Sequence, residues 1–149
     1  MPAVNHKFEL AARPVGLPKR SDWNFTQEPV RDPADGELLI KIIYISLDPA
    51  MRGWMNEGKS YIAPVGIGEV LRAGGAGRVI ASKHSGFAVG DYVSGAVGVQ
   101  EYAALDGAQL TKIDPKVSPL PTFLNCMLNS VPRPLTAAKV AALLRPLQG

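Results

Sequence analysis

The sequence Ser46-Leu47-Asp48-Pro49-Ala50-Met51-Arg52-Gly53 closes a hydrophobic strand with an aspartyl-prolyl turn. The preceding residues, 37–47, are rich in Leu, Ile and Tyr and contain no glycine or proline, so they predict a central strand. An aspartate can accept hydrogen bonds from the backbone ahead of it, and proline fixes φ for a turn. From these residues alone, Asp48-Pro49 is most simply a strand end followed by a turn.

Short extended stretches occur on both sides of this strand, separated by Gly, Pro or Asp. Their spacing and turn signals predict a β-sandwich or a small barrel. The 15 glycines and 13 prolines among 149 residues also argue for many turns and against a helical bundle. The predicted stretches are 6–12, 22–26, 67–72, 77–82, 91–97, 100–105 and 109–113.

The composition is that of a packed domain, with 46% hydrophobic and 19% charged residues. The formal net charge of +3 comes from scattered Lys and Arg, without a basic helix, so nucleic-acid binding is disfavoured. The single Cys126 excludes an intrachain disulfide and fits a reducing compartment. Residues 1–8 lack the apolar segment of a signal peptide, and no apolar run approaches about 18 residues. We therefore expect a cytoplasmic protein that does not span a membrane.

A metal site is not expected. One cysteine and two isolated histidines, His6 and His84, cannot supply the Cys/His sets that hold zinc. The carboxylates of Asp32, Asp35 and Glu37 lie in a turn and are expected to be solvated.

Three glycine-rich stretches resemble phosphate-binding loops only superficially. A dinucleotide fingerprint needs a strand before the glycines and a helix after them. Gly77 and Gly98 instead lead into predicted strands, so these glycines are expected at corners and bulges of a barrel. The stretches are 66–68, 74–77 and 94–98.

The Asp48-Pro49 corner and the segment Tyr61-Ile62-Ala63-Pro64 together resemble a family of enzymes. This family is the zinc-independent medium-chain dehydrogenase/reductases of the prostaglandin reductase, leukotriene B4 12-hydroxydehydrogenase and alkenal reductase type. Zinc-dependent relatives have a cysteine ligand at this corner, where this chain has Ser46 and Asp48. The resemblance implies that Tyr61 lies near the substrate carbonyl, where its hydroxyl could donate to a developing oxyanion.

The resemblance implies further substrate-binding positions. The turn after residues 90–93 lines the substrate pocket in this family, which places Ala96 and Val97 there. These side chains are smaller than the aromatic residues common in the family and imply a roomier or differently shaped pocket. Arg52 could position an anionic group of substrate or cofactor, although from the residues alone an exposed loop arginine is the simpler interpretation.

The resemblance covers about residues 5–125 and implies a mainly β, GroES-like, partly open barrel with short peripheral helices. We expect residues 1–125 to form this substrate-binding domain. Residues 126–149 are a divergent tail in which 135–144, rich in Ala and Leu, predict a short helix. The family binds NADPH in a Rossmann domain, but only 36 residues follow Ile113, about the length of one βαβ unit, and none shows a strand leading into a glycine turn. The cofactor-binding domain is therefore expected to be absent.

Two functions follow. The first is the substrate domain of an NADPH-dependent oxidoreductase that reduces the C=C bond of α,β-unsaturated ketones or aldehydes, inactive as this chain alone. A Rossmann-domain chain would then supply the cofactor, or the chain would self-associate through its uncovered apolar face. The alternative is a non-catalytic GroES-like binding or assembly module, a pseudoenzyme, because a fold does not fix a function.

Overall fold

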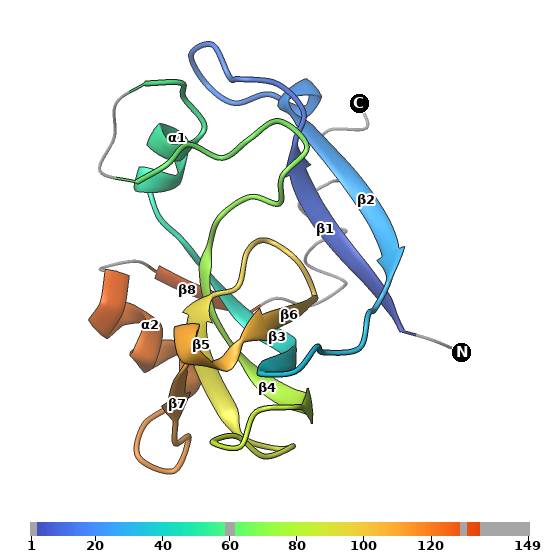
Figure 1. Cartoon of the computed structure of the whole chain (residues 1–149). Coiled ribbons are helices and arrows are strands. Elements are labelled where there is room, and N and C mark those ends of the chain that lie inside the picture. The colour runs from blue at the N-terminus through green and yellow to red at the C-terminus, as the bar shows by residue number, and fades with distance from the viewer. Residues whose placement is uncertain (1–2, 59–61, 129–130, 135–149) are drawn as a thin grey trace.

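The fold is mainly β, with two sheets and a few short helices at their edges (Figure 1). It is seen in a computed structural model that describes residues 3–58, 62–128 and 131–134. A two-stranded antiparallel sheet consists of β1 (Val4–Leu10) and β2 (Trp23–Pro29). The larger sheet has the order β6 (Tyr102–Asp106), β3 (Glu37–Leu47), β4 (Gly74–Ser82), β5 (Tyr92–Ala96) and β7 (Thr111–Ile113), with β8 (Val131–Pro134) also beside β3. The helices are α1 (Ala50–Trp54) and α2 (Leu120–Leu128), with 3₁₀ turns at Arg20–Asp22 and Gly107–Gln109.

Strand β3 is the centre of the larger sheet, as the sequence predicted. On one side it pairs with β4. On the other side its first half pairs with β6 and its second half with β8, all antiparallel. β8 contains Pro132 and Pro134, and proline, which lacks a backbone donor, is tolerated in a strand at a sheet edge.

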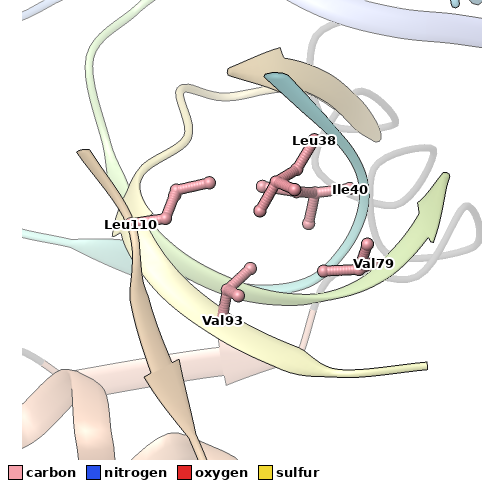
Figure 2. Close-up of a cluster of buried hydrophobic side chains, with 5 residues drawn as sticks. All are labelled: Leu38, Ile40, Val79, Val93 and Leu110. Carbon is pink, nitrogen blue, oxygen red and sulfur yellow. The ribbon is translucent and has the colours of Figure 1, made fainter. Parts of the chain in front are cut away.

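The sheet curls around an apolar core (Figure 2). Leu38 and Ile40 point inward from β3 because side chains alternate along a strand, whereas Lys41 between Ile40 and Ile42 is exposed. The cluster buries Leu38, Ile40, Val79, Val93 and Leu110. Among the described strands β6 and β7 are the two ends of the ladder and do not pair with each other. The predicted mainly β, partly open barrel with short helices is confirmed.

The small sheet is held against the barrel by Asn5, which is 5% exposed. Its side-chain oxygen accepts hydrogen bonds from the backbone of Glu101 at 3.2 Å and of Tyr102 at 2.9 Å, and its amide donates to Gln100 at 3.0 Å. Backbone bonds continue the junction, with Phe8 N donating to Val99 O at 3.0 Å. A buried amide with all these partners satisfies backbone groups that would otherwise lack one.

The structure corrects the prediction of a strand over 67–72. Gly66–Glu69 is a turn, in which the Glu69 carboxylate accepts from Gly66 N at 2.7 Å and Gly68 has φ of +82°. A left-handed glycine and a side chain that bonds its own backbone favour a turn over a strand. Only Val70 keeps a bridge, to Glu9.

Glu37 also differs from expectation. It begins β3 instead of lying in a solvated turn, and its side chain is 22% exposed. Its carboxylate accepts from both terminal nitrogens of Arg31, at 2.7 and 2.9 Å, and from Ala34 N at 2.9 Å. These bonds, that of Arg31 first, lower the pKa of Glu37 from 4.5 to about 2.

The predicted domain boundary at 125/126 falls inside α2, and the domain division stays a prediction. The helix predicted over 135–144 lies outside the described residues.

Candidate functional site

The Asp48-Pro49 corner turns the chain from β3 directly into α1. The Asp48 carboxylate accepts from Ala50 N at 2.7 Å, and the Asp48 carbonyl accepts from Met51 N at 3.0 Å. Pro49 has φ of −53°, which suits the start of a helix. The interpretation from the residues alone, a strand end stabilised by its own aspartate, is confirmed, and the following segment begins as a short helix.

The segment after α1 is closed at its base into a loop. Val65 N donates to Trp54 O at 2.8 Å. Arg13 Nη1 donates to two carbonyls, of Met55 at 2.9 Å and of Val65 at 2.5 Å. Both Met55 and Val65 are buried in an apolar cluster with Leu10. The start and end of segment 55–65 are therefore fixed on the barrel by one guanidinium and by packing.

A second arginine, Arg72, holds the same loop at Ala63, two residues before Val65. Arg72 Nη1 donates to Ala63 O at 2.8 Å, and its guanidinium carbon lies 5.8 Å from the centroid of the Trp54 ring. Arg13 and Arg72 were missed by sequence reasoning, because nothing in a single sequence separates an arginine that binds carbonyls from the other scattered cations. Tyr61, between Trp54 and Ala63 in the chain, lies outside the described residues.

Arg52, on α1, holds a neighbouring loop. Its guanidinium donates to Pro14 O at 2.9 Å, to Gly16 O at 2.9 and 3.2 Å, and to the side chain of Asn56. These contacts give Arg52 a structural role in the described residues. Its predicted contact with an anionic group of substrate or cofactor stays a prediction.

Ala96 and Val97 point to different environments. Ala96 is exposed at the end of β5. Val97 is 1% exposed and packs with Ile42 and Ile45 in the barrel core. The structure therefore leaves Ala96 accessible to a ligand and uses Val97 as a core residue, and their predicted role as pocket lining is not tested by this arrangement.

Two of the three glycine-rich stretches lie at least partly inside strands, and not at the corners predicted for them. Gly74–Gly77 lies inside β4, and Gly95 lies inside β5. Within 3–58, 62–128 and 131–134, no strand leads through a glycine turn into a helix as a dinucleotide site requires. In the same residues, no three His, Cys, Asp or Glu side chains are grouped as metal ligands. None of the helices found there has the length and apolar character to cross a membrane.

A hollow of about 330 Å³ lies elsewhere, between the small sheet and the outer face of β3 and β6. Asn5, Arg31, Leu39 and Tyr102 are among its lining residues, whereas Arg52, Ala96 and Val97 are not. This hollow and the predicted substrate residues Arg52, Ala96 and Val97 are thus in different places.

The sequence of residues 6–113 matches the family model described as the N-terminal domain of oxidoreductase. The chain is 38% identical over 109 residues to the NADPH-dependent curcumin reductase of Escherichia coli (strain K12), covering 73% of this chain and 32% of the reductase. It is 32% identical over 112 residues to the 2-alkenal reductase (NADP(+)-dependent) of Nicotiana tabacum, covering 71% of this chain and 32% of that enzyme. The chain thus spans about a third of the length of these relatives.

The fold comparison agrees with the sequence comparison. The crystal structure of CurA from Vibrio vulnificus in complex with NADPH superposes with a TM-score of 0.67 and 44% identity, covering 72% of this chain and 32% of CurA. The matched part has the GroES-like architecture that the sequence predicted, and the relatives are named as NADPH- or NADP(+)-dependent reductases or were solved with NADPH bound. The chain belongs to the medium-chain dehydrogenase/reductase family of the curcumin and alkenal reductase type, and its 149 residues cover that family's N-terminal domain.

Proposed function

We propose that this chain is the substrate-binding domain of an NADPH-dependent reductase that reduces the C=C bond of α,β-unsaturated ketones or aldehydes. The observation that carries the proposal is the match of residues 6–113 to the N-terminal domain of this family, with curcumin and 2-alkenal reductases among the relatives. Curcumin and 2-alkenals are both α,β-unsaturated carbonyl compounds. A substrate of the same class is therefore the simplest expectation for this barrel.

In the proposed reaction, the β-carbon of the substrate accepts a hydride and the electron pair of the double bond moves to the carbonyl oxygen. The enolate then takes a proton at its α-carbon. NADPH, when bound, supplies the hydride and becomes NADP⁺. The barrel's part is to hold the carbonyl in position and to place a hydrogen-bond donor where the negative charge develops.

Tyr61 is the proposed donor to that oxygen. Support comes from its sequence context and from the fixed positions of Ala63 and Val65, which Arg72 and Arg13 hold two and four residues further along the chain. Such preorganised donors stabilise a developing oxyanion strongly because they need no rearrangement during the reaction.

The residues that bind NADPH would belong to a nucleotide-binding domain, which the described residues do not include. We therefore propose that these 149 residues do not turn over substrate by themselves and that a Rossmann-type domain completes the site. A non-catalytic binding module is the second candidate, because a fold by itself does not fix a function.

A domain exchange tests the proposal. Residues 1–125 of this chain replace the corresponding N-terminal domain of the E. coli curcumin reductase, and oxidation of NADPH is followed with 2-alkenals and with curcumin. If the chain is the substrate-binding domain of a reductase, we expect the chimera to oxidise NADPH with these substrates and the isolated 149-residue chain not to do so. The matched variant Tyr61→Phe in the chimera should lower kcat by about 10²-fold, because one oxyanion donor is lost.

The outcomes separate the candidates. A folded chimera that binds NADPH and reduces none of these substrates favours the non-catalytic module. Turnover by the isolated chain contradicts the proposed need for a nucleotide-binding domain.

A further inference from the structure

The outer face of the barrel carries two cations in directly opposed positions. Lys41 of β3 and Arg78 of β4 are cross-strand partners, and both side chains are exposed. Like charges opposite each other on antiparallel strands destabilise the pair. Throughout the described part of the chain, neither side chain makes an ion pair or a hydrogen bond with a carboxylate.

Lys41 lies on the same face of the sheet as three lining residues of the 330 Å³ hollow, although it is not itself one of them. Across β3 and β6, Leu39 faces Ala104 and Lys41 faces Tyr102, in a register without a bulge. Leu39, Ala104 and Tyr102 all line the hollow. The Lys41 ammonium lies 6.0 Å from the centroid of the Tyr102 ring. The side chain of Lys41 therefore lies on the same face of the sheet as Leu39, Tyr102 and Ala104, which line the hollow.

The charges within the hollow are already paired. Arg31 donates two bonds to Glu37, at 2.7 and 2.9 Å. Glu28 accepts from Lys7 at 2.8 Å. The remaining lining includes apolar groups, namely those of Pro29, Val30, Leu39, Ala103 and Ala104. Lys7 also lies 3.1 Å from Glu9, so the paired groups add no positive charge to the hollow. The cations of this face without a carboxylate partner among the described residues are Lys41 and Arg78.

We propose that this face binds a small amphiphilic anion. A phosphate or carboxylate group contacts Lys41, and an apolar or aromatic body attached to it occupies the hollow against Leu39 and Tyr102. Arg78, whose Nη2 lies 3.6 Å from the position of a Cβ on Gly90, adds a second positive charge from the neighbouring strand. An anion here offsets the repulsion between the two cations, which nothing else in the described residues does.

This site is independent of the proposed reductase function. It uses none of the residues of the Asp48-Pro49 corner or of the loop that Arg13 closes. Two cations alone would accept any small anion. The hollow beside them restricts the ligand to an anion that also carries an apolar or aromatic group. Phenyl phosphate is a suitable probe because it combines a doubly charged head with one aromatic ring.

The test is a titration of the ¹⁵N-labelled full chain with phenyl phosphate, followed by amide chemical shifts. Saturable changes are expected at Leu39, Lys41, Tyr102 and Ala104. Lys41→Met should weaken binding on the order of tenfold, because it removes one charge-assisted contact, whereas Lys41→Arg should retain it. Arg78→Met should cause a smaller loss, about two- to threefold, that disappears at high salt.

Two controls make the result decisive. Lys116→Met removes a cation from the exposed turn after β7 and should leave binding unchanged. Inorganic phosphate should bind more weakly than phenyl phosphate, because it leaves the hollow unfilled. Equal affinity for these two anions, shifts that Lys41→Met does not alter, or the absence of saturable shifts would each overturn the proposal. Cosedimentation with anionic lipid vesicles would contradict the assignment to a small soluble anion.

Discussion

Replacing Gly77 with alanine measures how closely β4 lies against β3. A Cβ built on Gly77 would lie 2.4 Å from the Lys41 carbonyl oxygen and 2.6 Å from Cγ2 of Ile40. Ordinary contacts of a Cβ are about 1 Å longer. The carbonyl belongs to the central strand, which is paired with β4 on one side and β6 on the other, so it cannot move aside without breaking a ladder.

The expected cost follows from this geometry. Forcing a methyl group into a packed core costs about 1–3 kcal/mol, and a contact with fixed backbone belongs at the upper end. The loss of unfolded-state entropy in a Gly-to-Ala change offsets about 0.4–1 kcal/mol. Gly77→Ala should therefore destabilise the domain by about 2 kcal/mol, a decrease in Tm of about 4–8 °C for a domain of this size.

Gly53→Ala is the matched control, since Gly53 lies in α1 and a Cβ there meets nothing within 4 Å. This change should stabilise by up to about 1 kcal/mol, because alanine favours a helix. Urea unfolding monitored by the fluorescence of Trp23 and Trp54 gives both values. If Gly77→Ala proves as stable as Gly53→Ala, the close approach of β4 to β3 is wrong.

Three further perturbations test other parts of the structure. Asn5→Ala removes the acceptor of two buried backbone N–H groups and should destabilise by about 1–3 kcal/mol in urea unfolding; no change would mean that the small sheet is not held by this amide. Glu37 has a pKa of about 2 in the fold against 4.5, so its stabilising contribution is complete above about pH 5 and is lost as the pH falls toward 2; the difference in Tm between wild type and Glu37→Gln should shrink over that range, and a constant difference would contradict the ion pair. Arg52→Met should speed protease cleavage at residues 14–18, with Lys19→Met as the control, as identified by mass spectrometry; equal cleavage would show that Arg52 does not hold that loop.

The sequence predicted the parts of the fold that local patterns encode. β3 was predicted with its observed limits because a stretch of 11 residues rich in Leu, Ile and Tyr, without glycine or proline, has few alternatives. The strand predicted at 67–72 was wrong because the left-handed Gly68 and the bond from Gly66 N to Glu69 outweigh a short apolar run. The hydrophobic pattern of a sequence contains no information on such a turn.

The candidate site was predictable only where a motif is contiguous. The Asp48-Pro49 corner could be interpreted from adjacent residues, since the aspartate bonds the backbone two residues ahead. The closure of the loop by Arg13 could not, because the arginine is 42 and 52 residues from the carbonyls it binds. The burial of Val97 in the barrel core could not be predicted either, because it depends on the curl of the sheet; its predicted role in lining a substrate pocket stays a prediction.

The junction made by Asn5 has a consequence for the order in which the domain assembles during synthesis. The β1–β2 hairpin is local and can form as soon as residues 4–29 have emerged from the ribosome. The groups that secure it, at residues 100–102, are 95–97 positions further along the chain. Until they appear, the apolar side chains of Phe8, Leu10 and Trp23 lack part of their packing partners. A nascent chain of this protein therefore carries an undocked N-terminal hairpin until residues 100–102 have emerged, and this interval is when it would most need a chaperone.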